Sequence, residues 1–132
     1  MGQPHRIRST EGVLDAYRKR YAIGMGSSLG VTATGSPMSR ISGSWNHAMA
    51  WCGYDNRPSI KDKLGLRSAA IFIDQSWGNW SRVSNLPEEW KPWGEGMFAL
   101  ELNDLRRYIE RGECLCYIPD EATGVPVSAE HP

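Results

Sequence analysis

Residues 44–55 read SWNHAMAWCGYD and residues 68–78 read SAAIFIDQSWG, and these two apolar segments decide the fold. Side chains alternate between two faces along a β-strand, so His47, Met49 and Trp51 would share one face of the first segment. The Ile-Phe-Ile run favours a strand in the second segment as well. We therefore predict one strand in each segment, and each strand ends in a turn.

The two segments also carry polar side chains that can work as a pair. His47 stands at the start of the first segment, and Gln75 stands at the end of the second. An imidazole and an amide delivered by neighbouring strands can form a base and its orienting group. A single histidine on an apolar strand is, however, more often a structural residue than a catalytic one.

These motifs resemble the second half of the papain-like cysteine peptidases. The catalytic histidine of that family stands in an Asn-His-Ala-Val-x-x-x-Gly-Tyr pattern, which residues 46–49 and 53–54 match closely. The family then has a strand that ends in Asn-Ser-Trp-Gly, and residues 75–78 match it except that Gln75 replaces the asparagine. Residues 93–98, WGEGMF, match a third block of the family in part.

The resemblance covers roughly residues 13–102 and implies a role for each matched residue. His47 would be the base, and Gln75 would orient it through an amide on a stem one methylene longer than asparagine. Trp77 would shield the pair from water, which strengthens such a hydrogen bond. No cofactor and no metal ion is expected at this site.

The nucleophile of the family has no counterpart in this chain. The family's cysteine lies well before its histidine, in a Gln-x-x-x-Cys block that also supplies an oxyanion-hole glutamine. None of the 46 residues before His47 is a cysteine. The chain therefore resembles the histidine-bearing half of the fold, and shortened chains of this kind look similar to phage-encoded proteins.

The order of predicted elements indicates an α+β fold. It would be a curled antiparallel sheet or half-barrel of about five strands with two helices. We expect an extended arm over residues 1–9, a papain-like half-domain over 10–118 and a tail over 119–132. Glycine-rich residues 30–43 read as a long loop, and Thr10 and Asn103 read as helix caps. The predicted strands are 21–25, 45–54, 68–74, 96–102 and 113–118, with helices over 11–20 and 104–111.

Composition limits the partners of the chain. Fifteen basic and fifteen acidic residues cancel within 132 residues, so charge gives no case for nucleic acid or an anionic membrane. No secretory signal and no membrane-spanning segment is visible, so we expect a cytoplasmic or virion-associated protein. Six tryptophans, together with the Pro-rich residues 79–92, indicate either core filling or a protein interface.

Other residues offer weaker routes to catalysis. Cys52 follows His47 by five residues on the same strand, which places it on the opposite face and roughly 16 Å away. Cys114 and Cys116 would share a face of a later strand, and the expected state of all three cysteines is a reduced thiol. They could reach His47 only if that strand lay beside it. Ser27 and Ser28 have no supporting nucleophile motif.

Two functions remain open from the sequence. The first is a non-catalytic papain-like module, such as a phage virion component, that binds protein partners or itself through its Trp/Pro-rich surface and terminal arms. The second is the histidine half of a cysteine peptidase or amide hydrolase, completed by another chain or segment that supplies the cysteine. In either case we expect no activity from this chain alone.

Overall fold

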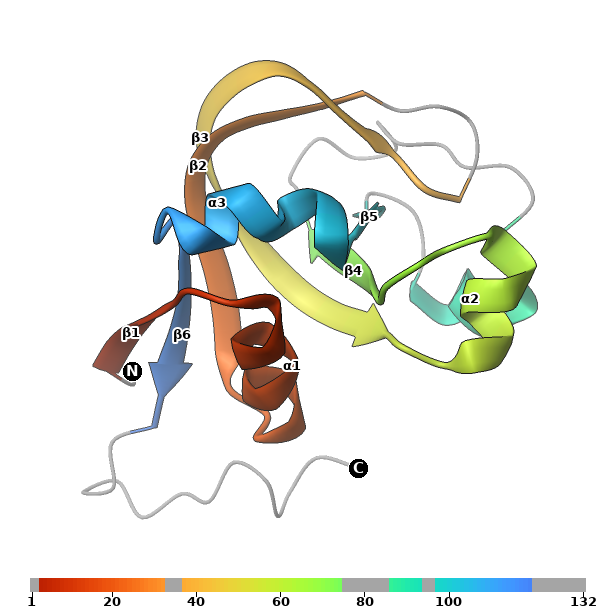
Figure 1. The fold of residues 1–132 in the computed structure, drawn as a ribbon, viewed down its shortest axis with the longest axis horizontal. Helices are drawn as coiled ribbons and strands as arrows, with labels where there is room; N and C mark the ends of the chain where they lie inside the picture. The colour runs from red at the N-terminus through yellow and green to blue at the C-terminus, as the bar shows by residue number, and fades with distance from the viewer. Residues whose placement is uncertain (1–2, 33–36, 75–85, 94–96, 120–132) are drawn as a thin grey trace.

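The chain folds around an antiparallel β-sheet (Figure 1). The structure, a computed structural model, describes residues 3–32, 37–74, 86–93 and 97–119. Within these residues six strands pair in the order β1-β6-β2-β3-β4-β5, so the sheet is open, with β1 and β5 at its edges. The strands are β1 Gln3–Ile7, β2 Ala22–Thr32, β3 Arg40–Asp55, β4 Ala70–Asp74, β5 Met97–Glu101 and β6 Cys114–Ile118.

A long hairpin of β2 and β3 forms the centre of the sheet. The two strands pair from Ile23 opposite Trp51 to Thr32 opposite Arg40, with register shifts on either side of Leu29. Such irregularities bend a strand pair, and Figure 1 shows the hairpin curving away from the rest of the sheet. The loop predicted over residues 30–43 is therefore wrong at both ends, because β2 continues to Thr32 and β3 begins at Arg40.

Gly30 explains why a glycine-rich sequence pairs well here. A β-carbon at Gly30 would contact the carbonyl oxygen of Ser42 and lie 2.8 Å from the carbonyl carbon of Gly43. The backbones of the two strands thus approach more closely at this point than any side chain allows. Glycine has a low propensity for β-strands, but only glycine fits where the two backbones lie this close together.

We predict that Gly30→Ala destabilises the protein by about 1–3 kcal/mol, because the clash is with backbone atoms that cannot rotate away. Gly26→Ala is the matched control on the same strand, since a β-carbon there has open space around it. Urea denaturation of both variants measures the difference. Equal stabilities would contradict the close approach at Gly30.

The main hydrophobic core lies on one face of the sheet, beneath α1 (Thr10–Arg18) and the segment formed by η2 (Leu102–Leu105) and α3 (Arg106–Glu110). Figure 1 shows α1 and α3 on the same side of the sheet. Helix α1 begins after Ser9, whose hydroxyl accepts a hydrogen bond of 3.0 Å from the Gly12 amide, so Ser9 is the cap rather than the predicted Thr10. The fully buried members of this core include Val13, Met25, Ile71, Ile73, Leu100, Leu105 and Ile109.

A second, smaller core lies on the opposite face, over β4 and β5 only. Along β4 the side chains alternate, because Ile71 and Ile73 enter the main core while Ala70 and Phe72 enter the second one. The second core is covered by α2 (Pro58–Leu64) and the 3₁₀ helix η1 (Glu88–Trp93). Strands β4 and β5 are thus buried on both faces, as their nearly continuous apolar sequences require.

The predicted α+β class and antiparallel sheet are confirmed, but the predicted numbers of strands and helices are wrong. The described residues form six strands rather than about five, and three α-helices rather than two. The additional strand is β1, in the expected N-terminal arm, which pairs with β6 from Gln3 opposite Ile118 to Ile7 opposite Cys114. Residues 120–132, in the expected tail, lie outside the described residues.

The additional helix is α2, which lies between the two predicted strands 45–54 and 68–74, where no helix was predicted. Pro58 stands in its first turn, and Gly65 ends it in the left-handed conformation with φ of 70°. These are the residue types that begin and end helices, and Ile60 anchors the helix in the second core. Among the helices of the described segments, none has the length and apolar character needed to span a membrane.

Candidate functional site

The predicted site belongs to β3 and to the chain that follows β4. The backbone of His47 lies in β3, opposite Ser27 of β2. At the end of β4, Asp74 lies opposite Ala50 of β3. Ala50 follows His47 by three residues, or roughly 10 Å along the strand. The described part of β4 therefore runs antiparallel to β3 and ends beside the strand that carries His47.

The side chains that would complete this site lie outside the described residues. This holds for Gln75 and Trp77, and for the side chain of His47, although its backbone is described. Their roles as base, orienting amide and shield, and the contact between His47 and Gln75, stay predictions. Ser27 and Ser28 are likewise described only through their backbone.

The alternation predicted for β3 is confirmed where side chains are described. Met49 and Trp51 are buried in the main core, whereas Ala48, Ala50 and Cys52 are exposed on the opposite face. Cys52 therefore faces away from the core that contains Met49 and Trp51. This arrangement agrees with the expectation that Cys52 is not the partner of His47.

Burial opposes the ionisation of all three cysteines. Cys114 and Cys116 point into the main core from β6, and burial raises the pKa of Cys114 to about 12 and raises the pKa of Cys116 as well. Partial desolvation, reinforced by the carboxylate of Asp74, raises the pKa of the Cys52 thiol to about 11. The environment of each sulfur thus favours the protonated thiol over the nucleophilic thiolate.

Cys52 has local partners on its face of the sheet. Its thiol lies 3.3 Å from the carbonyl oxygen of Phe72 and 3.2 Å from the sulfur of Met97. The thiol is therefore a weak donor at the border of the second core. Strand β6, which carries the other two cysteines, is separated from β3 by β2, so the sheet does not place those cysteines next to β3.

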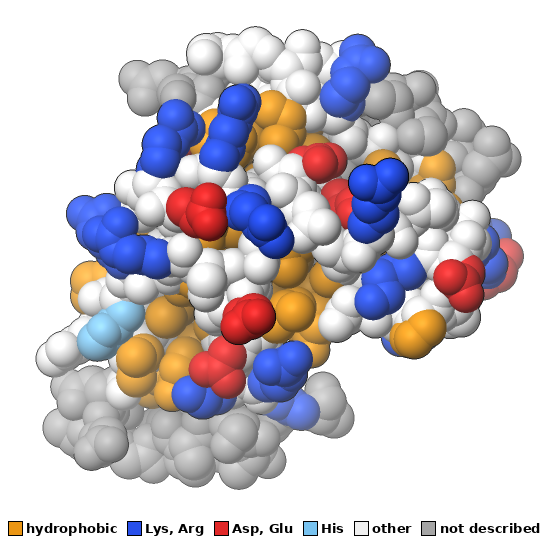
Figure 2. All heavy atoms as spheres, viewed as in Figure 1, with side chains coloured by type: hydrophobic (Ala, Val, Ile, Leu, Met, Phe, Trp, Pro, Cys, Tyr) orange, Lys and Arg blue, Asp and Glu red, His pale blue; other side chains and the backbone are white. Residues whose placement is uncertain are grey.

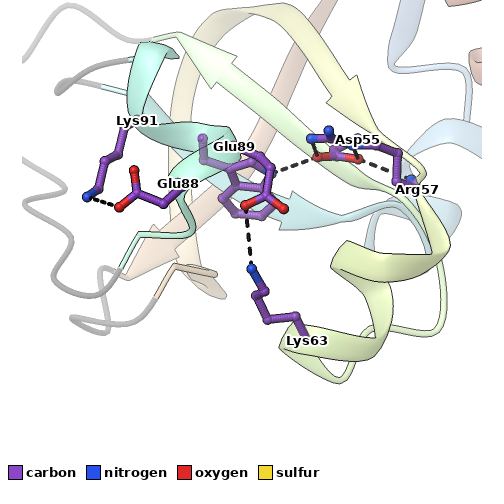
Figure 3. A network of polar contacts seen from close by, with 7 residues as sticks. Asp55, Arg57, Lys63, Glu88, Glu89 and Lys91 are labelled. Atoms are coloured by element: carbon purple, nitrogen blue, oxygen red, sulfur yellow. Dashed lines mark hydrogen bonds and ion pairs between the residues drawn. The ribbon is translucent and has the colours of Figure 1, made fainter.

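Asp55 is a buried carboxylate at the end of β3, and it was not among the predicted site residues. It accepts hydrogen bonds from the amide and guanidinium of Arg57, the shortest of which is 2.6 Å, and one of 2.9 Å from the indole of Trp90 (Figure 3). Burial by itself would raise the pKa of Asp55, but these hydrogen bonds outweigh it and lower the pKa. The sequence signal for this buried carboxylate was a single aspartate at the end of an apolar strand, with an arginine two residues later.

This network joins β3 to η1 and continues along the surface. Figure 3 shows Lys63 of α2 paired with Glu89 of η1, and Glu88 paired with Lys91. Trp90 is only 2% exposed and packs edge-on against Phe72, with ring centroids 4.9 Å apart. Trp90, like Trp51, therefore fills a core, which supports the packing alternative for these two tryptophans.

Tyr17 is a second group that the sequence did not single out for chemistry. Its ring stacks on Tyr54 with centroids 4.7 Å apart, and its buried hydroxyl has no hydrogen-bond partner among the described residues. Burial raises the pKa of Tyr17 well above its usual range. The phenol is therefore neutral near pH 7, so it does not supply a base to β3.

Several arginine side chains contact neighbouring groups of the fold, and Figure 2 shows Lys and Arg side chains interspersed with acidic ones on the face that carries α3. Arg6 donates a hydrogen bond of 2.7 Å to the carbonyl of Gly112, and Arg111 pairs with Glu113 at 2.9 Å. Arg107 and Arg111 also lie over the ring of Tyr108. These contacts account for Arg6, Arg107 and Arg111 as parts of the fold. Within the described segments, no three His, Cys, Asp or Glu side chains are grouped so that they could hold a metal ion.

Comparison of the chain with protein-family models, with curated proteins and with solved structures finds no match. The candidate site therefore rests on its own residues and on the arrangement of β3 and β4.

Proposed function

We propose that this chain is a non-catalytic interaction or structural module with a papain-like half-fold, in which His47 and Gln75 are the remnant of a peptidase site. The observation that carries the proposal is the state of its thiols. A cysteine peptidase attacks through a thiolate, which an imidazole or a helix N-terminus stabilises. The three cysteines of this sequence all have raised pKa values, and none of them lies at the N-terminus of a helix.

The arrangement of strands supports the papain-like part of the proposal. The motif with His47 lies on β3, and the motif with Gln75 follows directly after β4, the antiparallel neighbour of β3, as the resemblance requires. A phage virion is the setting that the resemblance to shortened phage-encoded chains favours.

A second candidate function is the histidine half of a split peptidase. It is favoured by the same adjacency of β3 and β4, since a partner that carried a Gln-x-x-x-Cys block would supply the missing sulfur. Mixing the chain with such a partner and a thiol-directed covalent inhibitor tests this candidate. Labelling of the partner's cysteine that requires His47 would establish it, and its absence in the assembled complex would exclude it.

For the chain alone, we predict slow thiol labelling that accelerates with pH. With a pKa of about 11, Cys52 is about one part in ten thousand thiolate at pH 7, and this fraction rises about tenfold for each pH unit. Labelling with iodoacetamide, followed by mass spectrometry between pH 7 and pH 9, measures the profile. A rate that is already maximal at pH 7 would show an activated thiol and contradict the non-catalytic proposal.

Two further measurements complete the test. Cys52→Ser should abolish labelling of the folded chain, because only the buried Cys114 and Cys116 remain, and labelling should return in urea. The interaction role requires concentration-dependent light scattering or capture of a protein partner. A strict monomer that captures no partner would count against that role without affecting the thiol result.

A further inference from the structure

A groove runs across the exposed face of β6, β2 and β3, opposite the main core. Its volume is about 870 Å³, which is in the range of pockets that bind ligands and peptide segments. Leu115, Gly24 and Ala50 lie side by side in register across the three strands. The groove is lined by Ala22, Gly24, Gly26, Ala48 and Ala50, with Leu115 and Tyr117 along β6.

The groove is the uncovered half of a face whose other half is covered. Over β4 and β5 this face carries the second core, which α2 and η1 cover. Over β6, β2 and β3 the same face has no covering helix or strand among the described segments. The glycines and alanines leave room above the strands, and a β-carbon at Gly26 would have no neighbour within 4 Å.

We propose that residues 120–132 of this chain bind in the groove. The chain enters those residues from Pro119, which itself lines the groove beside Tyr117. Thirteen residues span at most ~43 Å when extended, whereas the floor from Ala22 to Gly26 measures only ~13 Å. The segment therefore starts at the groove and has ample length to turn back along it.

The chemistry of the segment complements the lining. Residues 125–127 are Val-Pro-Val, whose compact aliphatic side chains suit a floor of glycine and alanine. Asp120 and Glu121 follow Pro119 directly, and Arg20 supplies a positive charge at the groove. Because the groove lies opposite Met49 and Trp51, the proposal does not depend on the peptidase kinship.

A spin label on the segment tests the proposal in the full chain. Ser128→Cys, next to the Val-Pro-Val run, in a Cys52→Ser background provides one exposed thiol for a nitroxide, since Cys114 and Cys116 are buried. We expect the backbone amide signals of Gly24 and Gly26 to lose most of their intensity through paramagnetic relaxation, while that of Ile109 in α3 is retained. Retained intensity at the groove amides would overturn the proposal.

Two variants locate the binding surface. Gly26→Leu fills the groove, and we expect it to restore the amide signals of Gly24 and Ala48, whereas Ser44→Leu, an exposed site on β3 outside the lining, should leave the intensity loss unchanged. Arg20→Glu removes the complementary charge without changing the floor and should restore the signals in part. If neither groove variant alters the relaxation, the segment binds elsewhere and the proposal fails.

A mixed sample identifies which copy provides the segment. Isotope-labelled chains without a nitroxide are mixed with equimolar spin-labelled chains that carry no isotope. We expect no loss of signal at Gly24 and Gly26, because each groove is filled by its own chain. Loss in the mixture would show that a second copy is the occupant, which would overturn binding within one chain.

Discussion

Trp51→Ala is expected to destabilise the protein by about 3–5 kcal/mol, a large part of the roughly 5–15 kcal/mol that stabilises a typical domain. Trp51 is 3% exposed and lies in the central strand β3, opposite Ile23 of β2 and Ile73 of β4. Its truncation would remove a large buried surface and leave a cavity that the surrounding strands cannot close. Urea denaturation followed by circular dichroism measures the loss.

The control for this prediction is Trp51→Phe. The indole N–H of Trp51 is buried without a hydrogen-bond partner among the described residues, and such a donor is costly to bury. Phenylalanine loses part of the packing but also removes that donor, so we expect a net change of about 1 kcal/mol or less. If Trp51→Phe lost as much stability as Trp51→Ala, the expected difference between the two variants would be absent. That result would show that the indole N–H has a hydrogen-bond partner.

The sequence predicted those parts of the fold where the pattern is local. The strand around Trp51 and the strand before Gln75 follow from alternation and from β-branched composition, and both are confirmed. The helix predicted over residues 11–20 is confirmed over Thr10–Arg18. The shared face of Cys114 and Cys116 follows from a spacing of two residues and is confirmed by their burial.

Elements that depend on distant pairing could not be predicted in this way. The polar, proline-containing segment of β1 becomes a strand because β6 offers it an unpaired edge. The glycine-rich hairpin pairs because Gly30 allows close approach of two backbones, a property of the register and not of the local sequence. The sequence left Trp90 open between core filling and a protein interface, and it is buried because α2 and η1 close over β4 and β5.

At the candidate site too, features set by the local sequence were predicted, and features set by distant pairing were not. Sequence placed His47 at the start of a strand and Gln75 after the next one, and the pairing of Asp74 with Ala50 agrees with that order. The raised thiol pKa values could not be predicted, because they depend on which strand faces bury their side chains. The groove was not predicted from the sequence either. Glycine or alanine at every second position of residues 22–26 and 48–50 indicates a sheet face with few large side chains.

Asp55→Ala is the second substitution with a large expected effect, a loss of about 2–4 kcal/mol at pH 7. The Asp55 side chain is 5% exposed, and its removal would leave the buried indole N–H of Trp90 without its partner at 2.9 Å. The pair with Arg57 contributes less, because that side chain is 55% exposed and screened by solvent. Glu88→Gln, which disrupts only a surface pair with Lys91, should change stability by less than about 1 kcal/mol.

The pH dependence separates the charge of Asp55 from its shape. Hydrogen bonds from Arg57 and Trp90 lower the pKa of Asp55 in the folded state, so its charge stabilises the protein above the unfolded-state pKa of about 4. This contribution is lost as the pH falls through the folded-state pKa, where the carboxylate takes up a proton. Asp55→Asn keeps the shape without the charge, so its stability deficit at pH 7 should shrink below about pH 4. A deficit that stays constant during acidification would mean that packing, and not the carboxylate charge, links β3 to η1.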